Sequence, residues 1–108
     1  MPKTITLNAS PTWPDVENDY ILRYERHTIG RIRLAETGWE WHISIPMAMP
    51  DWAKGKAESL DACRRAFAAA WGKLLIETSP ERLERAWELD RAFEKRQQNI
   101  AVTGKRDA

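Results

Sequence analysis

The sequence predicts a single α+β domain, in which an antiparallel sheet packs against one or two helices that follow it. Apolar and polar residues alternate along three short segments between residues 20 and 45, and this period is typical of strands with one buried face. The pair Thr37-Gly38 separates the last two segments and predicts a hairpin turn, since glycine readily takes a positive φ. An apolar stripe at helical spacing follows in residues 60–74 and predicts a helix that covers the sheet.

The expected strands are residues 20–25, 29–35 and 39–45, connected as a meander. The third strand alternates most regularly, and one of its faces carries only large apolar side chains: Trp39, Trp41, Ile43 and Ile45. We expect this face to form the core, where each aromatic side chain buries roughly 150–250 Å². Gly30 within the second strand predicts a bulge or a close approach of another segment. Residues 54–57 offer a short fourth strand as an alternative to a loop.

Two helices are expected after the strands. Ser59 is a typical N-cap residue, and the apolar stripe that begins after it consists of Leu60, Cys63, Phe67, Trp71 and Leu74. The second helix is expected to begin at Ser79-Pro80, because an N-cap followed by proline at the first helical position is a favoured start. Its charged sequence continues to about Gln98. The predicted order is therefore β-β-β-α-α.

Length and composition point to one small domain. The chain has 108 residues, of which 43% are hydrophobic and 31% are charged, as is usual for globular proteins. We expect a loosely structured arm at residues 1–18, the domain at 19–98 and a flexible tail at 99–108. Within the arm, pairing of Ile5 and Leu7 at a sheet edge stays open as an alternative. The net charge of +1 gives no overall attraction to nucleic acid or to an acidic membrane. The first residues lack the apolar segment of a signal peptide, and the single cysteine, Cys63, cannot form an internal disulfide, so we expect a cytoplasmic protein.

Side chains that could perform chemistry are few. His27, His42 and Cys63 are the only histidines and cysteine, too few for a structural zinc site without carboxylates. The sequence contains no glycine-rich phosphate loop and no known catalytic motif. Cys63 lies in the apolar stripe, where a small buried side chain is expected. We therefore expect no enzymatic activity, no metal site and no cofactor.

The segment that follows the third strand is the first candidate for a binding surface. Strand periodicity explains Trp39 and Trp41 as core residues, but it stops at Pro46, where a proline cannot donate to a sheet. Three large apolar residues continue beyond it: Met47, Met49 and Trp52. Two interpretations stay open. Trp52 closes the open end of the core, or these residues contact a partner protein, since methionine adapts to varied surfaces and tryptophan anchors interfaces.

The polar face of the sheet is the second candidate. It is expected to carry Arg23, Arg31, Arg33 and His42, together with Glu25, Glu40 and Ser44. Such a face can bind RNA or hold an acid/base pair, but mixed charges on a solvated sheet are usually cross-strand pairs. Sheets that bind single-stranded RNA present aromatic side chains to the bases, whereas the aromatic residues here are expected on the opposite face. Nucleic acid is therefore an unfavoured partner.

The second helix offers a third surface, because its apolar stripe is broad and weak. Trp87 and Phe93 are the large residues on this helix, and either can pack against a second copy of the chain. We expect a dimer as one form of partner binding.

The run ISIPMAMPDWAKGKAESLDACRRAFAAA resembles the strand, proline loop and capped helix of HicB-type antitoxins and related partial ribonuclease-H-like domains. The matching residues are Pro46, Gly55, Ser59, Leu60 and Ala62, and the similarity spans about residues 20–77. The same region is similar to small bacterial proteins to which no activity is attached. The resemblance implies a β-β-β-α order and neutralisation of a toxin. The DNA-binding part that such antitoxins usually carry at the C-terminus has no counterpart in residues 79–108, so DNA binding is not implied.

The sequence as a whole favours a small, non-catalytic protein-interaction module that binds another protein or a second copy of itself. The alternative is an antitoxin-like or nucleic-acid-binding regulator that uses the arginine-bearing face of the sheet.

Overall fold

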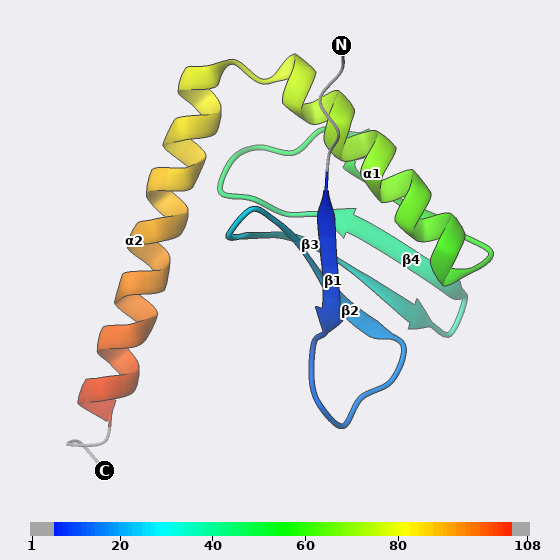
Figure 1. Cartoon of the computed structure of the whole chain (residues 1–108), viewed down its shortest axis with the longest axis horizontal. Coiled ribbons are helices and arrows are strands. Elements are labelled where there is room, and N and C mark those ends of the chain that lie inside the picture. Colours follow the sequence, from blue (N-terminus) through cyan, green and yellow to red (C-terminus); the bar gives the residue numbers. More distant parts are fainter. Residues whose placement is uncertain (1–5, 105–108) are drawn as a thin grey trace.

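Five antiparallel strands form one meander sheet in the computed structural model, which describes residues 6–104 and the side chains up to Lys95 except that of Glu94. The strands are β1 (Leu7–Pro11), β2 (Asp19–Tyr24), β3 (His27–Ala35), β4 (Gly38–Ile43) and β5 (Lys54–Ala57), and each pairs with the next. The predicted α+β class, the antiparallel sheet and the two helices are confirmed (Figure 1). The sheet has five strands, however, where three or four were expected.

Strand β1 matches the alternative that the sequence left open for the arm, in which Ile5 and Leu7 pair at a sheet edge. Leu7 begins the strand, and Ile5 lies outside the described residues. The strand lies within the segment expected to be a loosely structured arm, and it pairs with β2 from Leu7 opposite Tyr24 to Pro11 opposite Tyr20. Its sequence, LNASP, has no alternation of large apolar residues. An edge strand does not need this alternation, because backbone hydrogen bonds to the neighbouring strand can hold it in the sheet. Pro11 is tolerated at the end of an edge strand, where no ladder hydrogen bond is lost.

The tight packing expected at Gly30 is confirmed. The pairing of β2 with β3 shifts between Leu22 and Arg23, so that Ile29 is an extra residue in β3, as in a β-bulge. A side chain at Gly30 would collide with the carbonyl oxygen of His42 and with the ring of Phe67. The turn expected near Thr37 is also present, with Gly38 at a φ of 121°.

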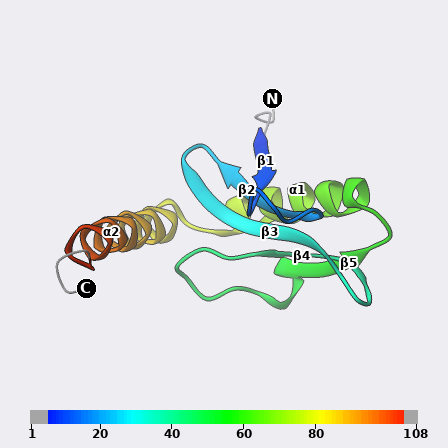
Figure 2. The same cartoon turned by 90° about the horizontal axis from the view of Figure 1, so that it is seen from below.

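Helix α1 (Leu60–Glu77) covers one face of the sheet (Figure 2). Its N-cap is Ser59 as predicted, because the Ser59 hydroxyl accepts a hydrogen bond from the Ala62 amide at 3.1 Å. The predicted stripe faces the sheet: Cys63, Phe67, Trp71 and Leu74 are buried and Leu60 is half-buried. The predicted core face of β4 meets this stripe, and Trp41 packs edge-on against Phe67 with ring centroids 6.0 Å apart.

Helix α2 (Pro80–Gly104) begins as predicted, with the Ser79 hydroxyl accepting from the Arg82 amide at 3.2 Å. It continues beyond Gln98, where its end was expected, and its C-terminal part extends away from the sheet (Figure 1). Its contact with the body is aromatic, because the Trp87 indole stacks on the His27 ring with centroids 3.8 Å apart. Of the two residues expected to meet a second copy, Trp87 is therefore buried in its own chain and Phe93 is exposed.

Two further observations concern the expected ends and environment of the domain. Residues 1–5 and 105–108, at the outer parts of the expected arm and tail, lie outside the described residues. Neither helix, over its described length, combines the length and apolarity needed to cross a bilayer.

Replacing Trp41 by alanine is expected to lower the free energy of unfolding by ~3–5 kcal/mol, because Trp41 is only 8% exposed in the middle of the sheet core. Denaturant and thermal unfolding measure the effect. Trp13→Ala is the matched control, since Trp13 is 59% exposed and its loss should change stability by no more than ~0.5 kcal/mol. Equal unfolding midpoints for Trp41→Ala and the wild type would contradict the assignment of this face to the core.

Candidate functional site

The first candidate surface is a groove between the 46–54 loop and the junction of the two helices, called the loop groove below. It has a volume of about 330 Å³ and is lined by Met47, Ala48, Met49, Pro50, Trp52, Leu74, Glu77, Thr78 and Arg82. The three residues predicted as contact residues therefore lie together. Met47, Met49 and Trp52 are each half-buried and pack against the edge of the core.

The conformation of the loop follows from its prolines and from one small buried residue. Pro46 and Pro50 lack an amide hydrogen, so neither can extend a strand ladder. A short 3-10 turn, η1 (Asp51–Ala53), follows Pro50, and Ala53 is buried beneath it. The turn directs Trp52 towards α1, where the Lys73 ammonium lies 4.4 Å from the centre of its ring. Trp52 thus closes part of the core, as one of the two interpretations predicts, and it also lines the groove.

The rim of the loop groove carries both signs of charge. Glu77 ends α1 and Arg82 lies in the first turn of α2, and both line the groove. Glu77 is also within 3.8 Å of the Lys73 ammonium. The accessible lining of the loop groove is more polar than apolar, and Met47, Met49, Trp52 and Leu74 supply its apolar part.

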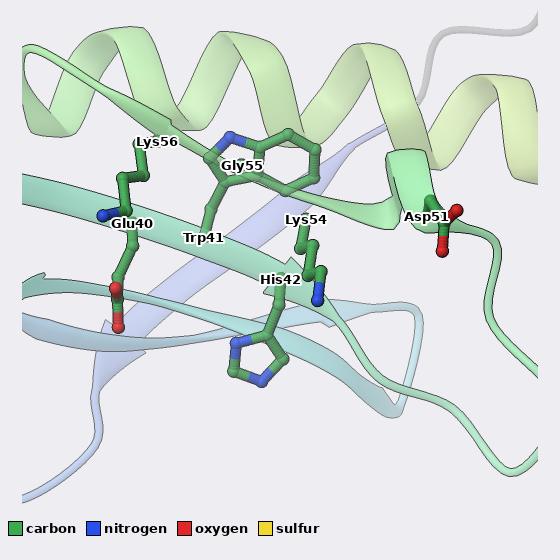
Figure 3. Close-up of a pocket in the computed structure, with 7 residues that line it drawn as sticks. All are labelled: Glu40, Trp41, His42, Asp51, Lys54, Gly55 and Lys56. Carbon is green, nitrogen blue, oxygen red and sulfur yellow. The ribbon is translucent and has the colours of Figure 1, made fainter.

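The second candidate surface is the outer face of the sheet, which α1 does not cover. The strand register places Arg31, His42 and Lys54 directly opposite one another on β3, β4 and β5. A hollow of about 550 Å³ lies beside them, called the outer-face hollow below, and it is lined by Glu40, Trp41, His42, Asp51, Lys54, Gly55 and Lys56. Figure 3 shows His42 and Glu40 projecting away from α1, whereas the Trp41 indole lies on the α1 side.

Two of the predicted arginines are paired with carboxylates. Arg31 donates from Nε to Asp19 Oδ1 at 2.7 Å and from its terminal nitrogen to the other oxygen of Asp19. Arg33 donates from Nε to Glu40 at 2.8 Å. The hydrogen bond from Arg31 holds the pKa of the Asp19 carboxyl below its usual value, although burial acts in the opposite direction. The structure therefore brings Arg31, Arg33 and His42 together, but both guanidinium groups are engaged.

Lys54, Lys56 and Asp19 belong to this face and were missed as site residues. The signal for the lysines was present, because residues 54–57 were recognised as a short strand in which Lys54 and Lys56 must share a face. The remaining predicted residue, Arg23, is exposed and lies opposite Thr28. It is on β2, whereas Lys56 is on β5, three strands away in the sheet.

The described residues contain no group of three or more His, Cys, Asp or Glu placed to hold a metal ion. Cys63 is fully buried, and this burial raises the pKa of its thiol. A thiol that stays protonated is a poor nucleophile, so Cys63 acts as a core residue.

The pKa of His42 is lowered by partial desolvation, and by Arg31 and Arg33 next to it. We expect an NMR titration to place this pKa below the ordinary value of about 6.5. Arg33→Gln should raise it, because the substitution removes one cation and frees Glu40. A value at or above 6.5 in the wild type would contradict the assignment of a positive environment.

The same shift gives the protein a pH dependence. Because the unfolded chain binds a proton at His42 more readily than the folded chain, stability should fall as the pH drops from above about 6.5 towards the lowered pKa. His42→Gln should remove this component of the pH dependence, which thermal unfolding at several pH values can measure.

Comparison with protein-family models, with curated proteins and with solved structures finds no match to this chain. The resemblance to antitoxins stays a prediction from the sequence, and a function has to be argued from the two surfaces.

Proposed function

We propose that the protein is a small, non-catalytic protein-interaction module whose loop groove receives a large apolar side chain of its partner. One observation carries the proposal: Met47, Met49 and Trp52 are half-buried along a single groove. Each has one side against the core and another side free to meet a ligand.

The chemistry of the groove supports a protein partner. Methionine side chains adapt to differently shaped ligands, and tryptophan is the residue most often found to anchor an interface. The volume of about 330 Å³ is near the lower end of ligand pockets, roughly 300–1,000 Å³, and suits one anchoring side chain. The charges of Glu77 and Arg82 can fix the direction in which the partner segment lies. An antitoxin is one case of such a module, with a small toxin as its partner.

The partner can be sought by placing a photo-crosslinking amino acid at position 48, an exposed position of the groove. The same amino acid at position 76 serves as the control, because Ile76 is 86% exposed and does not line the groove. A protein that is cross-linked only from position 48 is then purified for binding measurements.

Trp52→Ser is expected to weaken the affinity for this purified partner by at least ~30-fold, the effect of losing a strong anchoring residue. Ile76→Ser, which removes an equally apolar residue outside the groove, should leave the affinity unchanged. Calorimetry or interferometry measures the binding, and thermal unfolding of each variant reports on the fold. If Trp52→Ser unfolds the protein, Met49→Ser tests the same surface. Unchanged affinity in a folded groove variant would refute the role of the groove.

The second candidate function is a nucleic-acid-binding regulator that uses the outer face of the sheet. The observation in its favour is the row of Arg31, His42 and Lys54 across three strands. Two facts weaken it: Asp19 and Glu40 engage the neighbouring guanidinium groups, and the Trp41 indole at the hollow lies on the α1 side and is only 8% exposed. The electrostatic and stacking contributions to nucleic-acid affinity are therefore both small.

We expect single- and double-stranded oligonucleotides to bind no more tightly than ~10⁻⁴ M at physiological salt, the weak end of non-specific binding. Fluorescence anisotropy over a range of salt concentrations measures this affinity. Micromolar binding that weakens steeply with salt, and that is lost in Arg23→Gln or Lys54→Gln, would favour the regulator over the interaction module.

A further inference from the structure

Strand β5 is a free edge of the sheet. It is the last strand in the order β1–β5, and no other strand of the described chain pairs with its outer side. Every second residue of an edge strand directs its N–H and C=O away from the sheet, where they can pair with another extended chain. The question is which chain fits the side chains that β5 presents.

The residues of β5 alternate between two environments. Lys54 and Lys56 are exposed on the outer face, whereas Gly55 lies opposite Trp41 on the face of α1. A Cβ atom at Gly55 would be only 3.0 Å from the Trp41 indole, so glycine leaves the edge of the indole free of any side chain of β5. Both residues line the outer-face hollow, and Figure 3 shows Gly55 next to the indole. The indole itself fills the space over Gly55, so a side chain from an added strand would lie beside Gly55 at the hollow, with the indole as its neighbour.

The charges of the sheet indicate the side chains that suit an added strand. One cross-strand row alternates in sign from β2 to β5, in the order Asp19, Arg33, Glu40 and Lys56. This row ends at the free edge with the cation Lys56. An acidic side chain on an added strand, opposite Lys56, would continue the alternation of charge. The parallel row of Arg31, His42 and Lys54 also ends at the edge with a cation. Opposite charges directly across a strand pair stabilise it, and like charges destabilise it.

We propose that β5 pairs with an extended acidic segment of a partner protein, which adds to the sheet as a sixth strand. Acidic side chains at alternate positions of this segment lie opposite Lys54 and Lys56. The residue between them is apolar and lies beside Gly55 and the Trp41 indole. Backbone hydrogen bonds supply most of the affinity in this mode of recognition, and the alternate side chains supply the specificity.

A second copy of the chain is a poor occupant of the same edge. Antiparallel pairing of two β5 strands would bring lysines of one copy close to lysines of the other, which is unfavourable. Lysine on an edge strand is a known means of preventing pairing between identical chains. The two lysines therefore disfavour pairing with a second copy through repulsion, and they favour an acidic partner through attraction.

The proposal does not depend on the loop groove, because β5 and the groove are lined by different residues. The test uses only the purified protein and synthetic peptides, so its result is separate from any result on the groove. The probe is a short capped peptide of alternating Glu and Val, and the comparison peptide has Lys in place of each Glu. Amide chemical shifts and hydrogen exchange, both measured by NMR, report where each peptide binds.

We expect the Glu peptide to bind at least ~10-fold more tightly than the Lys peptide at low salt, since two ion pairs are gained and two repulsions avoided. It should protect alternate amides of β5 from exchange and shift the Gly55 and Trp41 signals. Added salt should reduce the difference between the peptides.

The double variant Lys54→Glu/Lys56→Glu is expected to reverse the preference, so that the Lys peptide becomes the tighter ligand. Arg85→Glu/Lys95→Glu, the same total change of charge at two exposed sites on α2, is the matched control and should keep the preference for the Glu peptide. Equal binding of both peptides to the wild type would overturn the proposal. So would absence of binding, signals that map outside β4 and β5, or an unreversed preference in a folded double variant.

Discussion

The contact between Phe67 and Gly30 is the constraint on which the remaining structure depends. Because Gly30 has no side chain, α1 can lie close enough to β3 for Phe67 and Trp71 to be fully buried. Close packing of this kind leaves no space for an added methyl group without a shift of the surrounding atoms. The position of α1 in turn places both candidate surfaces. Its last turns form one wall of the loop groove, and its start fixes the end of β5.

A series of aromatic contacts connects the packed core to α2. Tyr24 meets Trp71 edge-on with ring centroids 5.3 Å apart, Trp71 lies 6.3 Å from Trp87, and Trp87 stacks on His27. His27 Nδ1 is also 2.8 Å from a carboxylate oxygen of Asp90 on α2. The indole N–H of Trp71 has no hydrogen-bond partner among the described residues, which costs roughly 1–3 kcal/mol. The aromatic packing around this indole has to offset that cost.

The parts of the fold that were predictable from the sequence are those set by local chemistry. The caps at Ser59 and Ser79 depend on one hydroxyl and the adjacent turn, and the alternation in β4 depends on a period of two. Strand β1 stayed undecided because an edge strand with one small apolar face leaves no period to detect. The state of Trp52 was also undecidable, since its contacts depend on where α1 ends and not on its neighbours in the sequence. The outer face was predicted without Lys54 and Lys56. A short strand at 54–57 already puts the two lysines on one face, but which face it is follows only from the pairing of β4 with β5.

The two edge strands of the sheet, β1 and β5, differ in the side chains that would affect pairing with a further strand. Strand β1 ends in Pro11, and its outer-face residues Asn8 and Ser10 are uncharged, so nothing on this edge selects a partner by charge. Strand β5 has no proline and alternates lysine with glycine or alanine. Lysine and proline on an edge strand both oppose pairing with the same strand of a second copy. Lysine, unlike proline, leaves the backbone donors and acceptors of the strand in place. The two edges therefore differ in charge: the outer face of β1 carries no charged side chain, whereas that of β5 carries two lysines.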